Sequence, residues 1–142
     1  SNRIRELKKN LNDFDEIKKV ISSVGNNWSQ YSIHIIEPAL YLFTLFRDYK
    51  IISKVIENDK CSVTIKWENG PEITFITNSR KQGKSTIEIH GTKKTEKIVF
   101  DEYYSAFENT LDLFCKSSQN KKIVTKKEEL DIIVKIIEFG RS

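Results

Sequence analysis

Apolar residues recur along this chain with two different periods, first at helical spacing and then at strand spacing. The run 33–46 is too long and continuous for a strand and predicts a buried helix of about ten residues. Pro38 has no backbone N–H and fits best in a first helical turn, so we expect this helix to begin close to residues 34–37. The earlier segment 4–12 predicts a short charged helix with one apolar side.

The period then falls to two. In the segment 60–67, Cys61, Val63, Ile65 and Trp67 alternate with polar residues, as in a half-buried strand. Short turns rich in Gly, Asn and Lys separate further strand-like runs, at 16–24, 49–58, 71–77, 85–91 and 94–100. The consecutive strands after residue 48 predict an antiparallel meander with one buried face.

Two helices are predicted to close the chain. The segment 101–117 carries an amphipathic stripe, and 125–140 opens with Thr125 and Glu128 in the spacing of a capping box. Gly140 is predicted to end this second helix. Its core face is expected to hold Leu130, Ile133, Val134 and Ile137. The predicted fold class is α+β, a single domain over 1–142 with an open, mainly antiparallel sheet and helices on one face.

Composition narrows the class of protein. Of 142 residues, 38% are hydrophobic and 31% charged, and the 24 basic side chains are scattered among 20 acidic ones. A nucleic-acid-binding protein would concentrate its basic residues, so we expect no nucleic-acid partner. The absence of a long apolar run and of a signal peptide predicts a soluble, cytoplasmic protein with no membrane contact. Cys61 and Cys115 lie far apart without CxxC spacing, so no metal site is expected.

Recognisable catalytic motifs are missing from the sequence, and the five glycines never take GxGxxG spacing. The best candidate is His34, at the predicted start of the buried helix, with Glu37 one turn later. A helix N-terminus disfavours imidazolium, and a neutral imidazole suits acid–base work or hydroxyl binding. Alternatively, these two side chains only cap the helix. Trp28 and Tyr31 could line a sugar-sized pocket or equally be core anchors. His90 is expected to be an exposed turn residue.

Four stretches resemble the C-terminal domain of the glucose–fructose oxidoreductase/inositol dehydrogenase/MocA (Gfo/Idh/MocA) family of NAD(P)-dependent dehydrogenases. "YSIHIIEPALYLF" (31–43) is similar to the family's helix-opening motif, a small residue, then x-His-x-x-acid, then an apolar helix. "IKWENGPEITF" (65–75) and "IEIHGTKKTEKIVF" (87–100) resemble its central strands and turns. The stretch 106–142 resembles its two closing helices.

The resemblance implies roles for individual residues. His34 corresponds to the motif histidine that lies beside the substrate hydroxyl and takes part in proton transfer, and Glu37 keeps the acidic position. Gln30 stands where the family often has an aspartate, and Ser32 where it often has a glycine. A glutamine can orient a hydroxyl but cannot exchange a proton usefully, so the usual acid–base pairing is altered here. Trp28, Gln30, Tyr31, Ser32 and Glu37 are the expected substrate-binding residues.

The resemblance also implies that this domain is half of a larger protein. NAD or NADP would be bound by an N-terminal Rossmann domain that is absent from this chain, and no cofactor is expected in this domain. The expected function is the substrate-binding and oligomerisation half of an oxidoreductase acting on a sugar, sugar nucleotide or polyol, not catalytically complete alone. The expected partners are a carbohydrate-type substrate, the protein's own Rossmann domain, and further copies through the sheet face. The alternative is a non-catalytic binding or dimerisation module, in which His34 would be shielded by its own fold.

Overall fold

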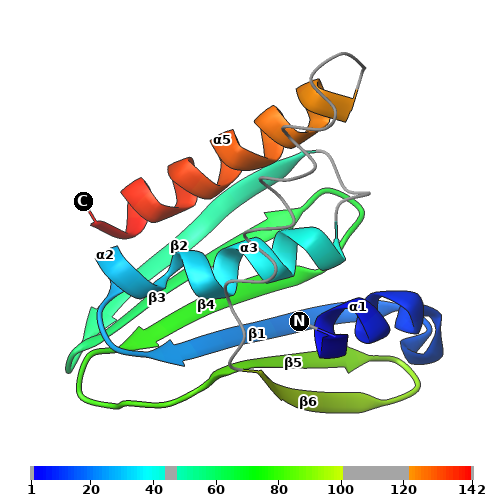
Figure 1. Cartoon of the computed structure of the whole chain (residues 1–142), viewed down its shortest axis with the longest axis horizontal. Coiled ribbons are helices and arrows are strands. Elements are labelled where there is room, and N and C mark those ends of the chain that lie inside the picture. Colours follow the sequence, from blue (N-terminus) through cyan, green and yellow to red (C-terminus); the bar gives the residue numbers. More distant parts are fainter. Residues whose placement is uncertain (1, 44–47, 101–121, 142) are drawn as a thin grey trace.

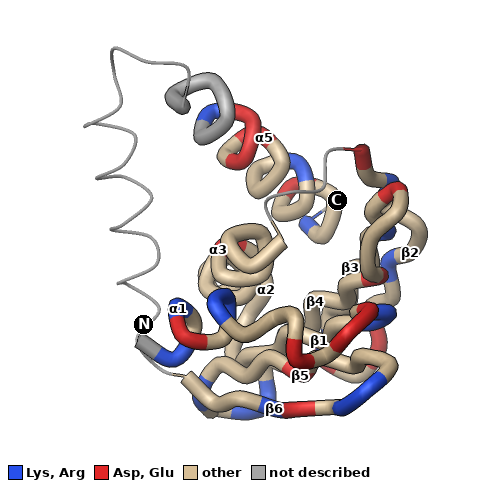
Figure 2. Tube along the Cα trace, turned by 90° about the vertical axis from the view of Figure 1, so that its right-hand side faces the viewer, with Lys and Arg blue, Asp and Glu red and all other residues tan. Residues whose placement is uncertain are grey.

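The computed structural model describes residues 2–43, 48–100 and 122–141, which form one sheet layer and one helix layer. Figure 1 shows the helices crossing a twisted sheet, and the view turned by 90° shows that they lie on one side of it (Figure 2). The sheet has six strands in the order β2-β3-β4-β1-β5-β6, and only the β1–β4 pair is parallel. The predicted α+β class with a mainly antiparallel open sheet is therefore confirmed.

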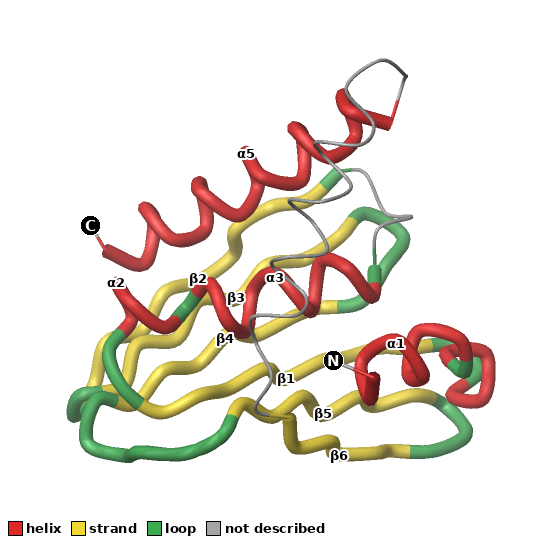
Figure 3. Tube along the Cα trace, in the orientation of Figure 1, coloured by secondary structure: helices red, strands yellow, loops and turns green. Residues whose placement is uncertain are grey.

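Most predicted elements are present with small shifts of their ends (Figure 3). The predicted helix 4–12 is divided into a helix and a 3-10 turn, η1. The predicted helix 101–117 lies outside the described residues. In chain order the elements are α1 (Asn2–Lys9), η1 (Leu11–Phe14), β1 (Ile17–Gly25), α2 (Trp28–Tyr31), α3 (Ile33–Leu42), β2 (Tyr49–Glu57), β3 (Lys60–Trp67), β4 (Glu72–Asn78), β5 (Ser85–Gly91), β6 (Thr95–Phe100) and α5 (Lys122–Arg141).

The strand order corrects the predicted meander. Strands β2, β3 and β4 do follow one another as antiparallel neighbours, but β1 lies between β4 and β5. Val20 of β1 is paired with Ile73 on one side and with Ile89 on the other. The loop from β4 to β5 crosses the end of β1, where the Asn26 N–H donates to the Lys81 carbonyl (2.9 Å). Alternation within a strand reports its buried face but not its neighbours, so the sequence could not predict this insertion.

The core lies between the sheet and the helices. Helix α3 packs over β1 and β5, whereas α5 packs over β3 and β2. Apolar side chains from alternate positions of the strands meet those of α3 and α5. The fully buried members include Val20, Val63, Ile65, Ile73, Phe75 and Ile87 from the sheet and Ile35, Ile36 and Ile136 from the helices.

Helix α5 differs from its prediction in three respects. It begins at Lys122, so Thr125 lies inside the helix and the predicted capping box is wrong. Val134 is 56% exposed, whereas Ile136 is fully buried. Residues at 133, 136 and 140 recur at i, i+3 and i+7, which is the helical face that meets the core. Gly140 belongs to this face and lies within the helix, so it does not end it.

Candidate functional site

The candidate site lies where β1 leads into α2 and α3. Asn27 caps α2, since its Oδ1 accepts a hydrogen bond from the backbone N–H of Gln30 (2.9 Å). The Asn27 Nδ2 in turn donates to Oε1 of the Gln30 side chain (3.1 Å). Asn27 was missed in the sequence, although a capping residue followed three positions later by a glutamine is a helix-start signal.

Helix α3 begins at Ile33, close to the predicted start. Ser32, between the two helices, has α-helical backbone angles (φ −60°, ψ −32°), so α2 runs into α3 almost without a break. Pro38 lies in the middle of α3 and cannot donate to the carbonyl four residues before it, which is that of His34. The near-continuity of the two helices places residues 30 and 34 on one face, four positions apart.

His34 is half-buried, and this burial lowers the pKa of its imidazole. We expected the helix dipole to disfavour the imidazolium form of His34. In the structure, desolvation by burial lowers the pKa instead. The Tyr31 ring meets the His34 ring edge-on, with centroids 5.6 Å apart at an interplanar angle of 78°. His34 is therefore a neutral imidazole near pH 7, held against an aromatic neighbour.

The other predicted site residues separate into buried and accessible groups. Ser32 is fully buried, and Glu37 is only 4% exposed, so neither side chain reaches the surface. Gln30 is exposed, and Tyr31 is partly exposed beside His34. A molecule that approaches this surface would meet Gln30, Tyr31 and His34 first.

Trp28 faces the opposite way. Its indole is 6% exposed and packs beneath α5, where Nε1 donates to the Ile137 carbonyl (2.9 Å). A Cβ added at Gly140 would lie inside 3.0 Å of this ring. These contacts support the alternative in which Trp28 is a core anchor that holds α2 against α5.

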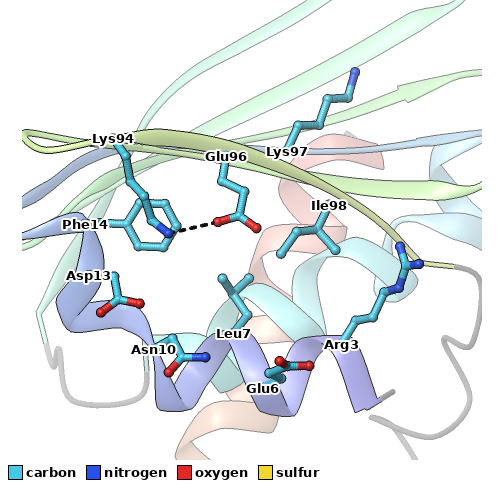
Figure 4. A pocket seen from close by; sticks show the side chains of 10 residues that line it. All are labelled: Arg3, Glu6, Leu7, Asn10, Asp13, Phe14, Lys94, Glu96, Lys97 and Ile98. Carbon is cyan, nitrogen blue, oxygen red and sulfur yellow. Dashed lines mark ion pairs between the residues drawn. The ribbon is translucent and has the colours of Figure 1, made fainter.

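A separate cleft of about 390 Å³ lies between α1, η1 and β6 (Figure 4). Leu7 and Ile98 line it, and its charged side chains carry both signs, including an ion pair between Lys94 and Glu96 (3.2 Å). His34 does not line this cleft.

His90, the other histidine, lies within β5 and not in a turn. It is partly buried, and its Nε2 lies 2.6 Å from Oε1 of Glu88. Among the described residues, no group of three or more His, Cys, Asp or Glu side chains could hold a metal ion. No helix in the described ranges is long and apolar enough to span a membrane.

Solved structures that share this fold include oxidoreductases. No protein-family model and no curated protein matches the sequence. The 3-ketoreductase KijD10 from Actinomadura kijaniata, solved with TDP-benzene and NADP, superposes with a TM-score of 0.69 at 10% identity, over 100% of this chain and 58% of its own. A myo-inositol dehydrogenase from Corynebacterium glutamicum superposes with a TM-score of 0.62 at 11% identity, over 95% of this chain and 56% of its own. An oxidoreductase from Thermotoga maritima superposes with a TM-score of 0.58 at 15% identity, over 94% of this chain and 56% of its own.

The fold is shared with part of each of these oxidoreductases, as expected from the α+β class predicted in the sequence. The chain spans a little over half the length of these enzymes. At 15% identity or less, the likeness establishes the architecture and leaves the chemistry to the residues of this chain.

Proposed function

We propose that this chain is the substrate-binding and oligomerisation half of a cytoplasmic NAD(P)-dependent oxidoreductase that acts on a sugar, sugar nucleotide or polyol. The observation that carries the proposal is the half-buried, neutral His34 at the start of α3, in a fold shared with KijD10 and myo-inositol dehydrogenase. A neutral imidazole at this place can accept or return the proton of a substrate hydroxyl. Tyr31 and Gln30 lie beside it as substrate contacts, with Trp28, Ser32 and Glu37 behind them.

The cofactor is assigned to an N-terminal Rossmann domain outside this chain. A dinucleotide site needs an open glycine turn between a strand and a helix. The turn from β1 to α2 does contain Gly25, but a Cβ added there would meet the Lys81 backbone, so the chain's own loop occupies that space. Helix α2 also has only four residues. The turn at Gly25 therefore does not fit a dinucleotide, which supports the proposal that the other domain carries out hydride transfer.

The sheet face opposite the helices is the proposed oligomer contact. Within this face Ser23 Oγ lies 2.7 Å from Thr86 Oγ1, and Thr64 Oγ1 lies 2.9 Å from Thr74 Oγ1. Ile76 adds an apolar side chain and is paired with Ser62 of β3 and Ser23 of β1. The outer faces of two such sheets can pack against each other at about 10 Å.

The decisive experiment is kinetic, in the full-length protein with its cofactor. His34→Ala is expected to lower turnover by roughly 10²–10⁴, as for loss of an acid–base group. His90→Ala is the matched control for the chemical step, because His90 projects from the sheet face opposite α3. Since that face is the proposed oligomer contact, the turnover of this variant is compared with that of the parent protein at equal oligomeric state. Equal turnover of the His34→Ala variant and the parent protein would reduce His34 to a structural residue.

Two further measurements test the division between domains. The native gene should encode a Rossmann glycine fingerprint upstream of this segment, and a gene without one would favour the non-catalytic module. Titration of this chain alone with NAD and NADP should give no tight binding. Micromolar affinity for either dinucleotide would contradict the assignment of the cofactor to the other domain.

A further inference from the structure

The cleft between α1 and β6 has an apolar floor and walls that carry charges of both signs (Figure 4). Leu7 and Phe14 are 5% and 1% exposed, and together with Ile98 they form the floor. Asn10 and Asp13 close the end nearest η1. The volume of about 390 Å³ lies within the range of small-molecule sites, about 300–1,000 Å³. The cleft shares no residue with the proposed substrate site.

On the β6 wall, the charges of the cleft are compensated. Lys94 forms an ion pair with Glu96 (3.2 Å), and its Nζ lies 4.8 Å from the centroid of the Phe14 ring. Lys97 lines the cleft with its stem, but its Nζ end points away from the cleft (Figure 4). This wall therefore offers a ligand little uncompensated charge.

The α1 wall carries two opposite charges that are held apart. Arg3 and Glu6 lie one turn apart on the same face of α1, at a spacing where a cation and a carboxylate can pair. Arg3 instead turns toward β6, and its Nη1 donates to the Val99 carbonyl (3.1 Å). Across the described part of the chain, no ion pair of 4 Å or less involves either side chain. The wall thus presents a guanidinium and a carboxylate, each with bonding capacity left for a ligand.

From this arrangement we propose that the α1–β6 cleft binds an α-amino acid with an apolar side chain. The carboxylate of such a zwitterion accepts hydrogen bonds from the remaining N–H groups of Arg3, and its ammonium group donates to Glu6. Both groups are attached to one carbon atom, which matches two protein charges one helical turn apart. The side chain then extends over the floor toward Leu7 and Ile98. A simple anion or cation would satisfy only one of the two charges and leave the other without a partner.

L-leucine is the probe, and three small molecules of related shape are its controls. 4-Methylpentanoate lacks the ammonium group, 3-methylbutylamine lacks the carboxylate, and glycine lacks the apolar side chain. Each is titrated into the ¹⁵N-labelled full chain at pH 7 and low salt, and the backbone amide signals of Leu7 and Ile98 are followed by NMR. We expect saturable binding of L-leucine with a Kd of about 1 mM. Each control should bind roughly three- to fivefold more weakly, as for loss of one exposed ion pair or of apolar contact.

Two charge variants of α1 identify the residues that bind the ligand. Glu6→Gln should weaken the binding of L-leucine roughly threefold and leave that of 4-methylpentanoate unchanged, because this acid has no ammonium group. Arg3→Gln should weaken L-leucine to the same extent and leave 3-methylbutylamine unchanged, because this amine has no carboxylate. Arg5→Gln is the matched control, since Arg5 is exposed on α1 but does not line the cleft.

The results distinguish a zwitterion site from a pair of solvated charges. The proposal is overturned if 4-methylpentanoate or 3-methylbutylamine binds as tightly as L-leucine, or if Glu6→Gln leaves the affinity for L-leucine unchanged. It is also overturned if no probe gives saturable shifts up to about 20 mM. None of these results bears on the turnover of the His34→Ala variant, so the proposed substrate site is tested separately.

Discussion

Replacing Gly140 by alanine should loosen the contact that holds α2 against α5. In the structure, an added Cβ at this position would lie inside 3.0 Å of Cε2, Nε1 and Cζ2 of the Trp28 indole. The indole is 6% exposed and cannot swing into solvent without giving up its hydrogen bond to the Ile137 carbonyl. The Gly140 carbonyl also lies 3.6 Å from the Cys61 thiol, which restricts movement of this part of α5 toward the sheet.

The size of the effect follows from opposing contributions. Overpacking a core contact costs about 1–3 kcal/mol, and a weakened indole hydrogen bond adds about 0.5–1.5 kcal/mol. Alanine has a higher helix propensity than glycine by about 0.8–1 kcal/mol, which offsets part of this cost. The variant should therefore lose about 2 kcal/mol of unfolding free energy, within a range of about 0.5–3.7 kcal/mol, or roughly 6–8 °C in Tm at the centre of that range.

Urea denaturation followed by tryptophan fluorescence measures this directly. Gly83→Ala is the matched control, because an added Cβ there meets nothing within 4 Å and no glycine in the described ranges has a positive φ. That control should be neutral or slightly stabilising. Trp28→Phe should relieve the clash, so Gly140→Ala should cost less in that background. A Gly140→Ala variant as stable as the parent, with unchanged Trp28 emission, would refute the steric argument.

Three further predictions can be checked in this chain. Burial lowers the pKa of His34 below its unfolded value of 6.5, so the unfolded chain takes up the proton first and unfolding free energy falls as pH drops below about 6.5. His34→Asn should make urea stability less dependent on pH between 7.5 and 5.5, and an equal dependence would contradict this. Lys8 Nζ donates to the Tyr41 carbonyl near the end of α3 (2.6 Å) and lies 4.2 Å from the centroid of the Tyr41 ring. Lys8→Met should therefore lower the free energy of unfolding in urea by about 1 kcal/mol. Burial raises the pKa of the Cys61 thiol, so the thiol should react slowly in the folded protein. In a Cys115→Ser background at pH 8, its reaction with a disulfide reagent should be at least roughly tenfold slower in the folded state than in urea.

The sequence predicted the strands better than their order. Period-two alternation gave the segments of β3, β4 and β5 to within about two residues, because each has one face against the core, whereas β2 has no buried residue. The insertion of β1 depends on pairing between segments some fifty residues apart, such as Val20 with Ile73, and no local pattern encodes it. The error at Val134 has a different origin. Leu130, Val134 and Ile137 also have helical spacing, and the packing of α5 on α2, α3 and β3 selects the face that carries Ile133, Ile136 and Gly140.

The candidate site could be located from the sequence, but its composition could not. Pro38 was expected in the first turn of α3 but lies in its middle, although the helix does begin at Ile33, next to His34. The same spacing grouped Glu37 with His34, yet Glu37 is buried in the structure. A position three residues further along a helix is rotated by about 60° from the first, which is enough to move a side chain from the surface into the core.

Helix α2 explains how a buried contact and an exposed site depend on one another. Helix α2 runs almost without a break into α3, and its other end is held by the Asn27 cap and by the Trp28 anchor beneath α5. The same turn carries Gln30 and Tyr31 on its outer side, beside His34. A shift of the Trp28 ring must therefore move these side chains as well. Gly140→Ala should accordingly alter the NMR signals of Gln30 and His34, although Gly140 touches neither.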